Sequence, residues 1–147
     1  MSSYKDRQSA DILNSVYKNA EMAYESSGDV LRRCKNARLY SEIAKQRERY
    51  KNISAEALGE LQRRGVRAQQ TPPAAKAMAK MGIAMQTMAD TSSSHIAALM
   101  IRGTTMGIID MQQTLNRSAA AEEDLQSDAR QLLRREQDYC ERLKRYL

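Results

Sequence analysis

Hydrophobic positions along this chain recur at steps of three and four residues, which is the period of an α-helix with one buried face. The pattern predicts four long helices of about 35 to 43 Å each, at residues 9–33, 37–64, 94–117 and 119–146. Only a few residues connect the first helix to the second and the third to the fourth, so we expect two antiparallel hairpins. Gly28 lies inside the first helix beside a cluster of polar residues, which allows a kink or a short break there.

The stretch between the two hairpins is about 28 residues long and has a helical pattern of its own. Thr71 is a suitable N-cap, Pro72 suits the first helical position, and a helix rich in Met and Ala follows at residues 72–89. A helix of that length runs along most of a bundle. We therefore predict a helical crossover that returns the chain to the same end before the second hairpin begins.

Composition supports an all-α protein with one domain over residues 1–147. The chain contains nine Met, no Trp, no Phe and only two Pro, and residues that favour helices dominate it. No apolar run approaches the ~20 residues of a membrane span, and the first residues do not resemble a signal peptide. The two cysteines lack metal-type or redox-type spacing, so we expect reduced thiols in a cytoplasmic protein.

Polar residues near the middle of the four helices interrupt or border their apolar stripes. These residues are Glu21, Gln46, Asp110 and Glu136. They predict a polar layer inside the bundle, where a carboxylate needs a partner or a metal because its burial is otherwise costly. Glu21 and Glu136 are candidates for a paired acid–base site. The alternative is a buried hydrogen-bonded network with Tyr17, Tyr139 or Arg102.

Three stretches carry a resemblance to a known group of proteins. KNAEMA, IRGTTMGIIDM and RREQDYCERLKRYL resemble segments of small, uncharacterised bacterial proteins with a ferritin-like four-helix bundle. The resemblance covers nearly the whole chain and implies the ferritin-like fold, with two hairpins joined by a long crossover. It implies no activity, because no activity is assigned to that family.

The metal-binding members of the ferritin-like group use a Glu on two helices and a Glu-x-x-His pair on each of the other two. By this resemblance the candidate metal ligands are Glu21, Asp110 and Glu136. Glu136, however, is followed three residues later by Tyr139, and the only histidine, His95, falls at the start of its helix. We therefore predict no resident metal and no cofactor.

Gly103 and Gly107 lie four residues apart on the third long helix, and therefore on one face of it. A glycine inside a helix costs roughly 1 kcal/mol relative to alanine, so two of them need a structural reason. We expect either close packing of another helix in the same chain or an interface between subunits.

The basic excess of the chain is concentrated in residues 32–67, which carry eleven basic and four acidic side chains, a net charge of +7. Candidate anion-binding residues in this segment are Arg47, Arg49 and Lys51. They suit phosphate contacts of a nucleic acid. No helix-turn-helix spacing accompanies them, and a solvated helix face is the simpler interpretation.

From the sequence we therefore predict a non-catalytic structural or protein-interaction bundle that self-associates. A degenerate ferritin-like metal-binding oxidoreductase is the alternative, and a nucleic-acid-binding module that uses residues 32–67 is the second alternative. A homo-oligomer, with room for a further protein partner, is the expected assembly.

Overall fold

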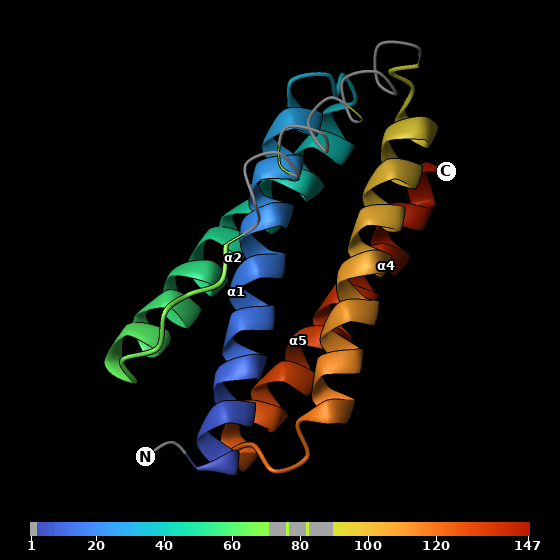
Figure 1. The fold of residues 1–147 in the computed structure, drawn as a ribbon. Helices are drawn as coiled ribbons and strands as arrows, with labels where there is room; N and C mark the ends of the chain where they lie inside the picture. The colour runs from blue at the N-terminus through green and yellow to red at the C-terminus, as the bar shows by residue number, and fades with distance from the viewer. Residues whose placement is uncertain (1–2, 71–75, 77–81, 83–89) are drawn as a thin grey trace.

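The computed structural model describes residues 3–70, 76, 82 and 90–147, and the elements in these ranges are helical (Figure 1). They are α1 (Tyr4–Leu31), α2 (Ala37–Arg63), α4 (Ser93–Arg117), α5 (Glu123–Leu143) and the 3-10 helix η1 (Lys144–Tyr146). The prediction of an all-α protein with four long helices is confirmed. The crossover helix predicted at residues 72–89 lies outside the described residues, apart from Lys76 and Gly82.

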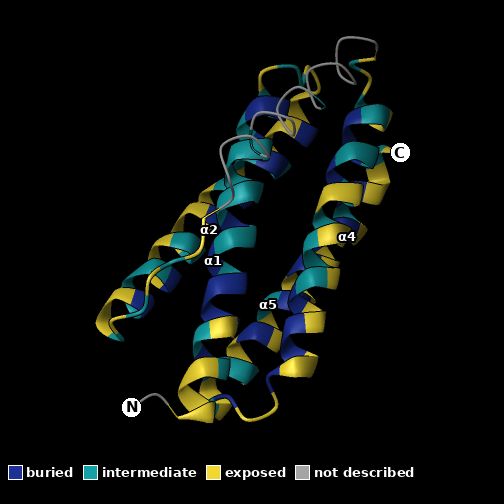
Figure 2. Ribbon diagram, in the orientation of Figure 1, coloured by how far each residue is buried: buried dark blue, intermediate teal, exposed yellow. Residues whose placement is uncertain are grey.

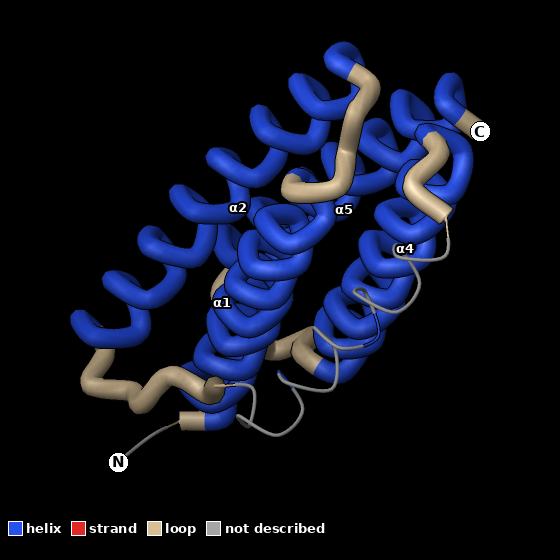
Figure 3. Tube along the Cα trace, turned by 90° about the horizontal axis from the view of Figure 1, so that it is seen from above, coloured by secondary structure: helices blue, strands red, loops and turns tan. Residues whose placement is uncertain are grey.

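Helix α1 lies beside both α2 and α4, and α4 packs against α5. Figure 1 shows the chain rising through α1, descending through α2, and later descending through α4 and rising through α5 to the C-terminus. Seen from above in Figure 3, the four helices lie side by side with the long axes of α1 and α2 close together. None of the described helices is both long and apolar enough to cross a membrane.

The first helix begins five residues earlier than the pattern predicted, at Tyr4 rather than residue 9. Ser3 and Asp6 form a capping box, in which the Ser3 hydroxyl accepts from the Asp6 backbone N–H at 3.0 Å and the Asp6 carboxylate accepts from Ser3 N–H at 3.3 Å. The possible break at Gly28 is also wrong, because α1 continues through this residue to Leu31.

The other helix ends follow local chemistry. Asn36 and Ser92 cap α2 and α4 by accepting from backbone N–H groups in the first turn. Gly65 follows the end of α2 with φ of 67°, a conformation that glycine adopts without strain. The last helix begins at Glu123 rather than at residue 119, because the backbone makes a turn in which Ala121 N–H donates to the carbonyl of Ser118.

Buried residues occur along all four helices (Figure 2), and two apolar clusters of them lie toward opposite ends of α4 and α5. One cluster consists of Val30, Leu39, Ile43, Ile96, Met100, Tyr139 and Leu143. The other consists of Ile12, Met111, Leu115, Ala121, Ala129 and Leu133. A third cluster joins α1 to the far end of α2 through Leu13, Tyr17, Ala57 and Leu61. Between the first two clusters, α5 places Glu136 one turn after Leu133 and one turn before Tyr139.

Candidate functional site

Glu136 is a buried carboxylate in the middle of the bundle, with only 7% of its surface exposed. Both of its hydrogen bonds come from uncharged side chains of α2. The Tyr50 hydroxyl donates to Oε2 at 2.6 Å, and Gln46 Nε2 donates to Oε1 at 3.1 Å. The pattern of the sequence placed Gln46 and Glu136 near the middle of their helices, but it did not identify Tyr50 as the partner of Glu136.

Burial raises the pKa of Glu136 from its ordinary value of 4.5 to about 6, because a low-dielectric surrounding disfavours the charged form. The hydrogen bonds from Tyr50 and Gln46 and the charge of Arg142 lower the pKa and offset part of this effect. The pKa of Tyr50 is raised by burial and by the neighbouring Glu136, so its hydroxyl keeps its proton and acts as a donor.

Tyr139 is fully buried one turn along α5, but it is not a partner of Glu136. Its hydroxyl forms no hydrogen bond with the rest of the described chain. The predicted network with Tyr139 or Arg102 is therefore wrong for this carboxylate, and the network is formed with α2 instead.

Glu21 lies outside this buried network and is half-buried on α1. Lys76 Nζ lies 2.8 Å from its Oε1 and 3.4 Å from Oε1 of Glu25. Burial raises the pKa of Glu21, but hydrogen bonds from Lys76 and Tyr17 and the charge of Lys76 outweigh it and leave that pKa lowered. The expected contact with Tyr17 is present, and the cation Lys76 supplies the countercharge.

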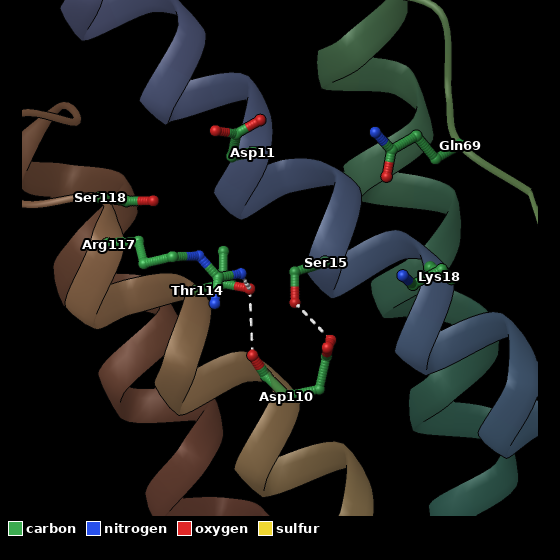
Figure 4. A pocket seen from close by; sticks show the side chains of 8 residues that line it. All are labelled: Asp11, Ser15, Lys18, Gln69, Asp110, Thr114, Arg117 and Ser118. Atoms are coloured by element: carbon green, nitrogen blue, oxygen red, sulfur yellow. Dashed lines mark hydrogen bonds between the residues drawn. The ribbon is translucent and has the colours of Figure 1, made fainter.

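Asp110 on α4 faces α1 and borders a polar pocket of about 260 Å³ (Figure 4). Ser15 Oγ and Asn19 Nδ2 donate to its Oδ2 at 3.1 and 2.7 Å. Thr114 Oγ1 donates to the carbonyl oxygen of Asp110 at 3.0 Å. Figure 4 shows that Asp11, Ser15 and Lys18 reach the pocket from α1, opposite Asp110, Thr114 and Arg117 of α4.

The three candidate metal ligands thus have separate partners, and the structure does not join them into one layer. Glu21 pairs with Lys76, Asp110 is held by Ser15 and Asn19, and Glu136 is held by α2. Over the described residues, no group of three or more His, Cys, Asp or Glu side chains is placed to hold a metal ion. The three carboxylates therefore accept hydrogen bonds at three separate positions, and burial raises the pKa of Glu136 among them.

Of the three candidate anion-binding residues, Arg47 is directed toward α1. Its guanidinium carbon lies 3.9 Å from the centre of the Tyr24 ring, and its Nε donates to the Tyr24 carbonyl at 3.2 Å. A Cβ at Gly28 would come within 3.0 Å of that guanidinium, so the glycine makes room for it. Arg49 Nη1 reaches Gln46 Oε1 at 3.4 Å, while Lys51 is exposed.

The two glycines of α4 have no backbone packed against them in the described chain. A Cβ at Gly103 would meet no atom within 4 Å, and one at Gly107 would meet only Asn19 Oδ1, at an ordinary 3.6 Å. Close packing by another described helix is therefore not what these glycines provide. The expectation of an interface between subunits stays a prediction.

Stability should depend on pH through Glu136. Its folded-state pKa is raised, so the folded state binds the proton more tightly and this contribution is lost as pH rises from about 4.5 through about 6. We expect the wild-type protein to lose about 2 kcal/mol of unfolding free energy relative to Glu136→Gln between about pH 4 and pH 7.5. Urea denaturation of both proteins across this range measures the difference, and parallel pH profiles would contradict the assignment.

The two buried tyrosines next to Glu136 should respond oppositely to loss of the hydroxyl. Tyr50→Phe removes a hydrogen bond to a carboxylate and should lower the unfolding free energy near neutral pH by about 1.5–3 kcal/mol. Tyr139→Phe removes a buried hydroxyl with no hydrogen bond to the described residues, and should be neutral or stabilising. Equal losses in the two variants would show that the contacts are assigned wrongly.

Arg47 is only partly exposed and should contribute to folding, unlike the exposed Lys51 one turn along α2. Arg47→Ala removes the contact with the Tyr24 ring and one hydrogen bond, and should lower the unfolding free energy by about 1–2 kcal/mol. Lys51→Ala is the matched control on an exposed position and should have little effect. Chemical denaturation of both variants checks this, and an Arg47 variant as stable as the control would disprove the structural role.

Comparison with known proteins gave no match to this chain among family models, curated proteins or solved structures.

Proposed function

We propose that this protein is a non-catalytic structural or interaction bundle of the ferritin-like type, built from two antiparallel hairpins, and that it self-associates through α4. The resemblance of three stretches to bacterial ferritin-like bundle proteins and the short connections within each helix pair support the fold. The contacts of Glu21, Asp110 and Glu136 favour structural roles for these carboxylates over an oxidoreductase site, because each has hydrogen-bond partners of its own. The position of Arg47 against Tyr24 likewise weakens the nucleic-acid interpretation.

The proposed self-association depends on exposed apolar residues on the outer face of α4. Met106 is 72% exposed and Ile109 is 52% exposed, although both are large and apolar. They lie on neighbouring turns of the helix, and Gly103 lies beside Met106 with open space where a side chain would be. Together these residues, here called the α4 face, combine apolar bulk with a place where a second backbone can approach closely.

A second copy of the chain is the partner that this face suits. Arg102 and Asp110 lie one turn before and one turn after Met106, in the same row of residues four apart. When two such rows pack in opposite directions about a twofold axis near Met106, Arg102 of each copy comes to the level of Asp110 of the other, whose carboxylate also accepts from Ser15 and Asn19 of α1. Arg102 is exposed and forms no salt bridge with another described residue, so it is free to make this contact.

The contact is small, and its strength follows from its size. Two large apolar side chains from each copy are buried, which must offset the loss of translational and rotational freedom on association. We therefore expect a dimer with a dissociation constant on the order of 10 μM to 1 mM.

Sedimentation measurements over that concentration range test the proposal. The wild-type protein should form dimers as concentration rises, whereas Met106→Glu and Gly103→Leu should remain monomeric with unchanged helix content. Neither substitution meets crowding from the described residues, because Met106 is exposed and Gly103 has open space around it. Tyr40→Glu is the matched control, since Tyr40 is an exposed apolar residue on α2, and it should still dimerise.

A wild-type protein that stays monomeric throughout would overturn the proposal. So would a Met106→Glu variant that dimerises as well as the Tyr40→Glu control.

A further inference from the structure

We propose that the polar pocket between α1 and α4 binds a small zwitterion, a molecule the size of a free amino acid with one ammonium and one carboxylate group. The pocket has a volume of about 260 Å³ (Figure 4). It shares Asp110 with the proposed dimer contact, but the inference does not rest on self-association. Its lining differs from the apolar lining that most small-molecule pockets have.

Four charged side chains border this one small space. Asp11 and Asp110 supply two carboxylates, and Lys18 and Arg117 supply two cations. None of the four forms a salt bridge within 4 Å of a described residue. Asp11 and Arg117 are exposed at the mouth of the pocket, whereas Lys18 and Asp110 are partly buried. A molecule with both charges satisfies them together, whereas a simple anion or cation leaves charges of its own sign facing it.

Buried hydroxyl groups form the wall between these charges. Ser15 and Thr114 are each only 7% exposed, and Ser118 is 1% exposed. The Ser15 and Thr114 hydroxyls donate to Asp110, and Ser15 Oγ also accepts from Asn19 Nδ2 at 3.3 Å, so each hydroxyl oxygen keeps one further acceptor position. Arg117 Nη2 donates to Thr114 Oγ1 at 3.5 Å, which holds the guanidinium on the pocket side of α4. These contacts position the cation before a ligand arrives.

Size and charge together define the ligand class. The volume corresponds to about eight or nine water molecules at ~30 Å³ each, which suits a free amino acid. Arg117 and Lys18 suit the carboxylate of the ligand. Asp11 and Asp110 suit the ammonium group of the ligand.

The test uses the twenty common amino acids as probes, each at about 10 mM, with acetate and methylammonium as single-charge controls. Two-dimensional NMR spectra of the full chain should show at least one amino acid shifting the backbone signals of Ser15, Thr114 and Ser118. Acetate and methylammonium should leave these signals in place. Titration calorimetry with the active amino acid then gives the affinity.

Substitutions at the exposed ends of the site make the test specific. Arg117→Gln and Asp11→Asn should each weaken binding of the active amino acid at least tenfold while helix content stays unchanged. Arg134→Gln and Asp128→Asn are matched controls on the exposed surface of α5 and should bind like the wild type. Met106→Glu should also bind normally, which separates this inference from the proposed self-association.

The inference is overturned if no amino acid shifts these signals, or if acetate or methylammonium alone shifts them with the same affinity. It is also overturned if Arg117→Gln and Asp11→Asn bind as tightly as the α5 controls.

Discussion

The burial of the Glu136 carboxylate between α5 and α2 constrains the rest of this bundle. A buried carboxylate without an adjacent cation needs a donor for each oxygen, and both donors, Tyr50 and Gln46, stand on α2. A slip of α5 by one turn would leave the carboxylate without them. The ion pairs Arg142–Glu42 and Arg64–Glu122 extend the same register toward the two ends of the bundle. These outer pairs are partly exposed and contribute little by themselves, so the buried contact sets the register.

The polar residues of α1 connect the bundle to its loops in a similar way. Ser9 Oγ accepts from Glu122 N–H at 3.0 Å, just before α5 begins, and Asn14 Oδ1 accepts from Gln69 N–H at 2.7 Å, beyond α2. Ser15 bonds to Asp110 of α4. Helix α1 is therefore buried on several sides, with hydrogen bonds directing polar side chains to particular backbone groups. The polar pocket lies between this helix and α4, where polar side chains line the space between them.

The helical period of the sequence was sufficient to find the four helices and to place Gln46 of α2 in the interior. It was also sufficient to place Glu136 inside the bundle. It could not identify the partners of Glu136. A helical period gives the direction of a side chain around its own helix, but not its position along the axis relative to residues of a neighbouring helix. The early start of α1 was missed, although the Ser3 and Asp6 spacing of a capping box was present.

Glycines show the same limit. Gly28 and Gly103 look alike in the sequence, but a Cβ at Gly28 would meet the Arg47 guanidinium, whereas one at Gly103 would meet open space. The choice between a packed and an open glycine depends on tertiary contacts, which a single helix pattern does not contain. The sequence likewise could not predict the charged lining of the pocket. Asp11 and Arg117 are separated by more than a hundred residues and line the same pocket only because α1 and α4 pack together.

The most direct test of this account is the titration of the Glu136 side chain itself, followed by the chemical shift of its carboxyl carbon in NMR spectra of the folded protein. A carboxylate that is buried and held by neutral donors should titrate with a pKa of about 6. A midpoint at or below 4.5, the ordinary value of a glutamate, would show that Glu136 is solvated or paired with a cation. That result would contradict the register of α5 on α2 from which the rest of the account is built.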